Sequence, residues 1–401
     1  MLRTLQSTGF IVLIKILLNC LSLISALTIG LAGSASASDG PAAPLKPSIA
    51  PLQTAHTFAQ VQEGGRTSTL LVVAMGKDAV HAIDLSAMRQ HYSADAFNVI
   101  EQFSAATLDQ LARRTQEVRS YPIDRLLNVG PRGVRHIAAG TNYTAHGEET
   151  GLDEAFLFPK LSPATGPRAK VSAAPGTLLD YEVELCARFD REIRSMADFD
   201  AARKGFFLCG DFSDRATLVR NLNLQDILSG DGFPDAKSGP DRFPAGALLV
   251  VPHDWERFVD SVTISTWVDG KRRQYAQASD MIKDLRTIVQ ETLAEAGTRT
   301  WSFRDGRIPM IERGAIGTDS AILTGTGEGV IFQEPDETVM KSVMGAPDRA
   351  AQLVQIERYL AAEQAKRIYL QPGQQVRYES NYLGRIVSDV VASAPSGVPG
   401  R

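Results

Sequence analysis

Cysteine is scarce in this sequence, with three residues in 401, and one of them, Cys20, lies in the apolar N-terminal segment. We therefore expect no metal site built from cysteines. Long runs of lysine or arginine are also missing, and the formal net charge is −4. Without a basic footprint the chain is not expected to bind nucleic acid, and a small-molecule partner fits better.

Two common catalytic signatures are absent as well. No Gly-x-Ser-x-Gly elbow occurs, which argues against a serine hydrolase of the usual type. The glycine-rich loop at 325–329 lacks the Lys-Ser/Thr of a phosphate-binding loop, so no nucleotide is implied. The composition, 44% hydrophobic and 22% charged, is that of a soluble globular protein long enough for one large or two smaller domains.

The N-terminus has the features of an export signal. Arg3 and Lys15 precede an almost wholly apolar run at 16–31, and small residues follow at 34–38. This pattern predicts a secretory signal peptide over 1–37, cut after Ala37, and hence an exported protein, periplasmic or extracellular. The alternative is an uncleaved membrane anchor, because residues 10–31 could cross a bilayer if Lys15 were tolerated.

The mature chain divides into regions of different composition. A Pro/Ala-rich linker is expected over 38–54, a smaller N-terminal region over 55–130, a catalytic domain over 131–392 and a disordered tail over 393–401. The catalytic region is dominated by short β-type runs at 135–139, 246–251, 261–268 and 321–323. One helix is well marked at 280–296, with Ser279 as a possible N-cap. The pattern is that of an α+β protein that is predominantly β.

Three acidic residues form a candidate metal site. A strand projects alternate side chains to one face, so Glu182 and Glu184 should point together, and Asp211 follows another apolar run. Carboxylates held side by side repel one another unless a cation neutralises them. Oxygen ligands favour a hard divalent ion, so Mg²⁺ or Mn²⁺ is expected, with Ca²⁺ possible.

A second candidate lies upstream, where His146 is followed three positions later by Glu149. An imidazole oriented by a carboxylate is a general-base pair. Glu148 competes with Glu149 for the role, and only the spacing favours the latter.

The order of these motifs resembles the fumarylacetoacetate hydrolase family across about 125–392. The motifs are Asn-Tyr-x-x-His-x-x-Glu at 142–149, Phe-Pro-Lys at 158–160, Asp-Tyr-Glu-x-Glu-Leu at 180–185, Gly-Asp-Phe-Ser-x-Arg at 210–215, Lys237, and Thr-Gly-Thr-Gly-Glu-Gly-Val at 324–330. The resemblance implies a fumarylacetoacetase-like C-terminal catalytic fold, a mixed β-sheet roll, and a homodimer. It assigns metal binding to Glu182, Glu184 and Asp211, catalysis to His146, Glu149 and Lys237, and substrate contacts to Tyr143, Lys160, Arg215 and Thr326.

The implied activity is divalent-metal-dependent hydrolysis of a C–C bond in a 1,3-diketone or acylpyruvate-like acid, through an enolate. The alternatives within enzymes are decarboxylation of a 2-oxo acid of the oxaloacetate type, and isomerisation or hydration of an unsaturated 2-oxo acid. An alternative of another class is an exported binding protein for small molecules that performs no turnover.

The sequence departs from the family pattern in three places. Gln374 stands where an aspartate is usual, Gly327 replaces a proline, and about forty residues are inserted at 331–369. The insertion contains an amphipathic stretch at 348–368 with Leu353, Ile356 and Leu360 on one stripe. These changes bear on substrate identity and leave the metal ligands in place.

Cys186 and Cys209 remain after cleavage of the signal, both on the strands that carry the acidic residues. They could form a disulfide in an oxidising compartment. They could equally be buried as small hydrophobic side chains.

Overall fold

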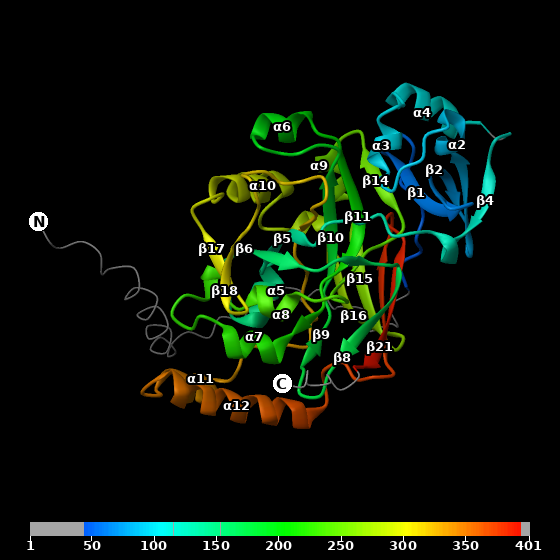
Figure 1. Ribbon diagram of the computed structural model, residues 1–401. Helices are drawn as coiled ribbons and strands as arrows, with labels where there is room; N and C mark the ends of the chain where they lie inside the picture. The colour runs from blue at the N-terminus through cyan, green and yellow to red at the C-terminus, as the bar shows by residue number, and fades with distance from the viewer. Residues whose placement is uncertain (1–43, 115, 153, 394–401) are drawn as a thin grey trace, which may run out of the picture. The chain divides into compact units, whose positions relative to one another are not determined.

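A ten-stranded mixed sheet organises the fold (Figure 1). Its strand order is β4 (Arg119–Pro122), β3 (Ala79–Asp84), β2 (Arg66–Met75), β1 (Ala55–Glu63), β14 (Leu249–Pro252), β11 (Lys204–Gly210), β10 (Val183–Phe189), β19 (Ile322–Leu323), β5 (Arg135–Gly140) and β6 (Phe156–Leu161). Neighbours are antiparallel except β19 and β5, which are parallel. The central strands β10 and β11 are buried along their whole length, as expected of strands covered on both faces.

A five-stranded sheet carries the second layer of strands, in the order β16 (Lys271–Gln277), β15 (Thr263–Val268), β20 (Gln375–Ser380), β21 (Arg385–Ala392) and β8 (Arg168–Ala173). Three strand pairs complete the β structure: β9 (Leu179–Asp180) with β12 (Ser213–Asp214), β7 (Ala164–Thr165) with β13 (Phe243–Pro244), and β17 (Thr300–Phe303) with β18 (Gly306–Pro309). The expected α+β fold in which strands predominate is confirmed.

The helices are short and connect or cover the strands. They are α2 (Leu85–Arg89), α3 (Phe97–Ile100), α4 (Ala105–Ala112), α5 (Thr144–Thr150), α6 (Met196–Ala201), α7 (Arg215–Asn221), α8 (Phe233–Lys237), α9 (Trp255–Asp260), α10 (Leu285–Ala294), α11 (Glu337–Met344) and α12 (Arg349–Lys366), with single 3₁₀ turns η1 (Ile123–Arg125), η2 (Ile227–Ser229) and η3 (Ala278–Asp280).

This computed structural model describes residues 44–114, 116–152 and 154–393. The expected signal peptide, the first part of the linker and nearly all of the expected tail lie outside these residues. Within them, no helix combines the length and the hydrophobicity that crossing a bilayer requires.

The N-terminal strands extend the sheet of the catalytic region. Strand β1 pairs with β14, with Phe58 opposite Leu249, and also with β2. From Pro44 onward the chain forms one compact unit. Residues 55–130 therefore share a backbone hydrogen-bond network with the strands that carry the acidic residues.

The helix expected over 280–296 is shorter than the sequence pattern indicated. It starts after Asp284, whose carboxylate accepts a hydrogen bond from the Thr287 amide, whereas Ser279 lies in η3. The segment between them is held by Asn142, whose side-chain oxygen accepts from the Lys283 amide. Tertiary contacts thus use the residues that would have formed the first turn.

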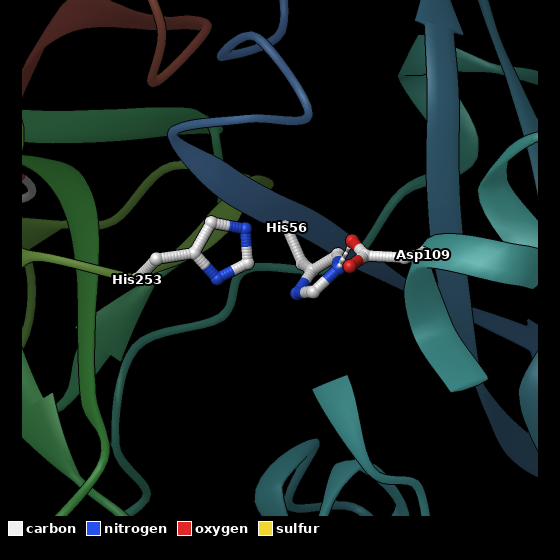
Figure 2. Close-up of side chains that lie close together, drawn as sticks. All are labelled: His56, Asp109 and His253. Atoms are coloured by element: carbon white, nitrogen blue, oxygen red, sulfur yellow. Dashed lines mark hydrogen bonds and ion pairs between the residues drawn. The ribbon is translucent and has the colours of Figure 1, made fainter. Parts of the chain in front are cut away.

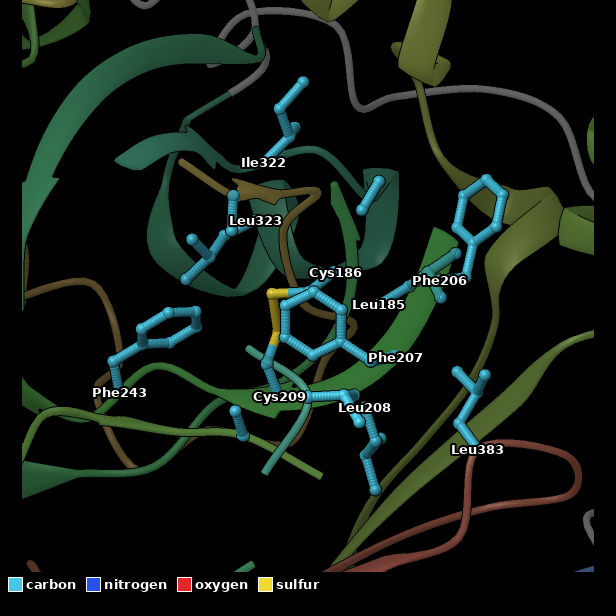
Figure 3. Packing of buried hydrophobic residues seen from close by; sticks show 14 of the residues in the cluster. Leu185, Cys186, Phe206, Phe207, Leu208, Cys209, Phe243, Ile322, Leu323 and Leu383 are labelled. Atoms are coloured by element: carbon cyan, nitrogen blue, oxygen red, sulfur yellow. A yellow bond between two sulfur atoms is a disulfide. The ribbon is translucent and has the colours of Figure 1, made fainter. Parts of the chain in front are cut away.

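Cys186 and Cys209 form a disulfide between β10 and β11, with their Cα atoms 5.9 Å apart. Cys209 lies opposite Glu184 in the ladder, and Cys186 lies two residues further along β10 on the same face. Phe207, Phe243 and Leu323 are among the buried side chains packed around the bridge (Figure 3). The two thiols left open by the sequence are therefore paired at the centre of the core.

Candidate active site

Glu182, Glu184 and Asp211 converge as the sequence predicted, and their carboxylate oxygens lie within 4.8 Å of one another. All three are buried. The local structure differs in one respect, because Glu182 lies between β9 and β10 rather than on a continuous strand. Its carbonyl accepts a hydrogen bond from the Asp211 amide at 2.9 Å, which aligns the two segments without a strand.

Two buried lysines contact this cluster. Lys237, at the end of α8, places Nζ 2.7 Å from Glu182 Oε1 and 2.9 Å from Asp211 Oδ2. Lys160, on β6, places Nζ 2.6 Å from Asp211 Oδ1 and also donates to the Lys237 carbonyl. Burial lowers the pKa of Lys160, even though Asp211 opposes the change. Burial also acts against the charge of Lys237, but Asp211 and Glu182 outweigh it and raise the pKa of this lysine.

Arg215 opens α7 and joins two carboxylates. Its Nε lies 2.9 Å from Asp180 Oδ2, and its Nη2 lies 2.7 Å from Glu182 Oε1. Asp180 also accepts the amides of Ile331 and Phe332, where the insertion begins. This aspartate therefore connects the guanidinium beside the cluster to the first residues of the inserted segment.

The two glutamates differ in protonation because their partners differ. Burial raises the pKa of Glu182, but Lys237 and Arg215 outweigh this effect, and the pKa falls to about 2. Glu184 receives a hydrogen bond from the Gly325 amide at 2.6 Å but no direct ion pair. Burial, together with the charges of Asp211 and Glu182, holds the pKa of Glu184 well above its usual range.

The donor set fits a hard divalent cation. Three convergent carboxylates supply only oxygen ligands, which Mg²⁺ and Mn²⁺ prefer. Glu184 has no cation of its own, so a divalent ion beside it would favour its charged form. The residues that would hold the ion are Glu182, Glu184 and Asp211.

The His146–Glu149 pair forms on α5, with His146 Nδ1 3.3 Å from Glu149 Oε2. Glu148 is exposed, and the contact with His146 is made by Glu149. Because a carboxylate can only accept, the pair places the imidazole proton on Nδ1 and leaves the lone pair on Nε2. His146 lines a cavity together with Glu182 and Lys237.

The loop that carries the altered family motif fixes Glu149. The Gly329 amide donates to both carboxylate oxygens, at 3.2 and 3.1 Å, and Gln333 Nε2 donates to Oε1 at 2.8 Å. Gly329 has φ +98°, and a Cβ there would lie 2.1 Å from the Arg273 carbonyl oxygen. Only glycine fits at this position.

Thr326 lines the same cavity, but its hydroxyl is committed to the protein. It donates to the Val183 carbonyl at 2.7 Å and accepts from Gln274 Nε2 at 2.9 Å. Tyr143, the other expected substrate contact from this region, is buried next to Glu184, and its hydroxyl has no hydrogen-bond partner among the described residues. Burial, and then the charge of Glu184, raises the pKa of Tyr143.

The cavity has a volume of about 210 Å³, and its lining is mostly apolar. Much of the apolar lining comes from α7, from the residue that follows it and from the insertion: Leu218, Val219, Leu222, Phe332, Val339, Met340, Val343, Ile356 and Tyr359. The amphipathic stretch read from the sequence corresponds to α12, which buries Ile356 and Leu360. The insertion thus forms a wall of the cavity onto which His146, Glu182, Arg215, Lys237 and Thr326 open.

Comparisons with known proteins place the chain in a family. Residues 135–391, more than half of the chain, match the family model described as fumarylacetoacetate (FAA) hydrolase C-terminal. The chain belongs to the fumarylacetoacetate hydrolase family, as the motif order predicted.

Solved structures share the fold at low sequence identity. A fumarylacetoacetate hydrolase from Exiguobacterium antarcticum is 18% identical, with a TM-score of 0.52, and the match covers 84% of this chain and 100% of that one. A probable 2-hydroxyhepta-2,4-diene-1,7-dioate isomerase from Mycobacterium abscessus is 20% identical, with a TM-score of 0.51 and the same coverage. A putative HpcE protein from Mycobacterium smegmatis is 18% identical, with a TM-score of 0.52, and the match covers 84% and 99% of the two chains. No curated protein matches this sequence.

Two residues of the site were not singled out from the sequence. Asp180 stood inside a quoted motif but received no role. Gln274 donates to Thr326 and to the Gly327 carbonyl and accepts from the Val183 amide. On β16 only Gln274 and Ala276 are buried, and nothing in the run Lys-Arg-Arg-Gln-Tyr-Ala-Gln sets the first glutamine apart from its polar neighbours.

Proposed function

We propose that this protein is a divalent-metal-dependent enzyme that hydrolyses a C–C bond in an acylpyruvate-like or other 1,3-dioxo acid. The observation that carries the proposal is that His146, oriented by Glu149, lines the same cavity as Glu182, next to Glu184 and Asp211. This combination supplies a general base and a binding site for a hard cation at one cavity.

The charges around the cluster favour an acidic substrate. Asp180, Glu182 and Asp211 are balanced by Lys160, Lys237 and Arg215 when Glu184 is neutral. A divalent ion with Glu184 ionised adds two positive charges and one negative charge. The loaded site therefore has one positive charge in excess, which the carboxylate of a 2-oxo acid would neutralise.

The bound ion would act as a Lewis acid that polarises the oxygens of the substrate and stabilises developing negative charge. His146 Nε2 accepts a proton from water, and the hydroxide attacks the carbonyl carbon of the acyl group. The C–C bond breaks as its electron pair passes to the neighbouring carbon, which later takes the proton from His146. Lys237 supplies positive charge at the cavity wall, and the positioned base is worth about 10²–10⁴ in rate.

The apolar wall favours a hydrocarbon substituent on the substrate. Val339, Met340, Val343, Ile356 and Tyr359, all from the insertion, line the same cavity as the charged residues. Burial of each methylene contributes about 0.8 kcal/mol to binding. We infer that the carboxylate end lies at the charged cluster and that an apolar acyl group packs against α11 and α12.

Turnover assays with Mg²⁺ or Mn²⁺ test the proposal. Acylpyruvates should be cleaved with incorporation of labelled oxygen from water into the released acid, and His146→Ala should abolish turnover while Mg²⁺ binding persists. Unchanged turnover in His146→Ala would refute the assigned base.

The same assay separates the other candidates. Release of CO₂ from oxaloacetate would mark a decarboxylase, and rearrangement of an unsaturated 2-oxo acid without label would mark an isomerase. The structural likeness to a probable isomerase makes the latter the second candidate. Tight binding with no turnover across the panel would instead support an exported binding protein.

A further inference from the structure

A second group of potential metal ligands lies outside the cavity. His56 on β1, Asp109 on α4 and His253, just after β14, place one ligand atom each within 4.8 Å of the others (Figure 2). Figure 2 shows the His56 ring between the His253 ring and the Asp109 carboxylate, with the two rings turned at a steep angle to each other. None of these residues takes part in the proposed reaction.

Backbone pairing between β1 and β14 fixes the positions of the histidines. His56 lies opposite Val251 in the ladder, and the His253 amide donates to the Thr54 carbonyl at 3.0 Å. The two rings are in edge-to-face contact, with centroids 4.8 Å apart. Asp109 reaches the pair from α4, and its Oδ1 lies 2.9 Å from His56 Nε2.

The hydrogen bonds of the cluster suit metal binding. His253 Nε2 lies 3.0 Å from the Leu52 carbonyl oxygen, which can only accept, so Nε2 carries the proton and Nδ1 keeps its lone pair. A backbone carbonyl that orients an imidazole in this way is typical of metal-ligating histidines. The separation of His56 Nε2 and Asp109 Oδ1 is close to the ligand spacing of about 3.3 Å that a tetrahedral zinc site with bonds of about 2.0 Å requires.

The partial exposure of the cluster also leaves its ligand atoms accessible to an ion. His56 is almost fully buried, Asp109 is partly exposed and His253 is exposed, so an ion can enter from solvent. Burial lowers the pKa of His56, although its hydrogen bond with Asp109 opposes this. His253, as an exposed side chain, can move the distance needed to close the site.

We propose that His56, Asp109 and His253 form a site for a divalent transition-metal ion, with water as the fourth ligand. Two imidazoles and one carboxylate favour Zn²⁺, Ni²⁺ or Cu²⁺ over Mg²⁺ and Ca²⁺. On binding, His56 changes tautomer by exchange with solvent, so that its one proton lies on Nδ1, and Nε2 and the Asp109 oxygen both bind the ion. The ion would join β1 and α4 of the N-terminal region to the segment that follows β14.

Calorimetric titration of the full chain without a histidine tag tests this site. Excess Mg²⁺ is present throughout, so that the acidic cluster is occupied while Ni²⁺ or Zn²⁺ is added. The wild type should take up one equivalent. His253→Gln should weaken uptake by at least about 100-fold, because loss of even an orienting partner of a ligand usually costs 10–100-fold.

His81→Gln is the matched control, since His81 is exposed on β3 and lies outside the cluster. It should bind Ni²⁺ like the wild type. Ni²⁺ should raise the Tm of the wild type and of His81→Gln but not that of His253→Gln, and all three should retain Mg²⁺-dependent turnover. Because His253 is exposed, its variant is expected to fold.

Equal Ni²⁺ affinity in wild type and His253→Gln would overturn the proposal, and so would the absence of any uptake in excess Mg²⁺. In a crystal soaked with Zn²⁺, an anomalous peak between His56, Asp109 and His253 would support it. Apart from the turnover control, none of these readouts depends on the reaction proposed for the other site.

Discussion

At the scale of single residues, hydrogen bonds distinguish Glu149 from its neighbour Glu148. Glu149 is held by the Gly329 amide and faces His146, whereas Glu148 is exposed. Glu149→Gln should lower kcat by about 10²-fold or more, because a neutral amide neither fixes the tautomer of His146 nor stabilises its protonated form. Glu148→Gln should behave as wild type. Steady-state kinetics of both variants on a cleaved substrate would check this, and a similar loss in the two would contradict the assignment.

The raised pKa of Glu184 determines how stabilisation of the protein by Mg²⁺ should depend on pH. In the metal-free protein the Glu184 carboxyl is neutral below its raised pKa. Its contribution to the free energy of unfolding is therefore present at low pH, and is lost as the pH rises from the usual pKa of a glutamate through the raised pKa. Mg²⁺ needs the charged form and displaces the proton, so binding strengthens over the same interval.

The increase in Tm on adding Mg²⁺ should therefore be larger at about pH 8 than at about pH 6. Thermal melts with and without Mg²⁺ at the two values measure it. Asp211→Asn should lose the Mg²⁺ response at both, and an equal response of the wild type at both would count against the role of Glu184.

At the scale of elements, the loop after β19 controls the catalytic pair through its backbone. Gly329→Ala would bring a side chain against the Arg273 carbonyl oxygen and displace the amide that holds Glu149. A misplacement of about 1 Å near a catalytic group can cost about 10²-fold in kcat.

Gly373→Ala is the matched control, because Gly373 has φ +95° but no heavy atom within 4 Å of the added Cβ. It should show a modest loss of stability and normal kcat. Kinetics and melting curves of the two variants would separate the steric effect from the strain of a positive φ, and normal kcat in Gly329→Ala would refute the anchoring role.

The inserted helices α11 and α12 should set the size of the substrate. Met340 lines the cavity, so Met340→Trp would fill part of the space proposed for the acyl group. KM for acylpyruvates with long acyl chains should rise by about tenfold or more, while the acetyl compound is little affected. Glu337→Gln, on the same helix but exposed and not lining the cavity, serves as the control. An equal effect of Met340→Trp on short and long chains would argue against an acyl pocket.

The sequence predicted those parts of the fold and of the candidate site that depend on local patterns. Spacing selected Glu149, and the β-type runs at 135–139 and 261–268 lie close to β5 and β15. It was insufficient where tertiary contacts decided the outcome: Asp284 rather than Ser279 caps α10, and Glu182 lies off the strand. The cavity wall formed by the insertion could not be predicted from the sequence. The pattern of α12 shows only that one face of the helix is apolar, and not what that face covers.

At the scale of the whole molecule, the Cys186–Cys209 disulfide bears on export. Such bridges form in oxidising compartments, which supports the proposal that the protein is exported. Closing a loop across a separation of 23 residues stabilises the fold by about 3 kcal/mol in the chain-entropy account.

Mature protein isolated after export should therefore show no free thiol when denatured without reductant, since cleavage at Ala37 removes Cys20. Thiol titration with intact-mass measurement would check both points. One free thiol and a mass that includes residues 1–37 would indicate the uncleaved anchor, and three free thiols would contradict the bridge. The expected homodimer stays a prediction for sedimentation analysis of the same sample.

The ammonium of Lys237 between Glu182 and Asp211 has a consequence for how the protein is made. The chain supplies its own cation to this buried group of carboxylates, so a newly folded molecule does not need an ion from its surroundings to fold. Protein treated with a chelator should remain folded but inactive, and should regain activity when the divalent ion is added again.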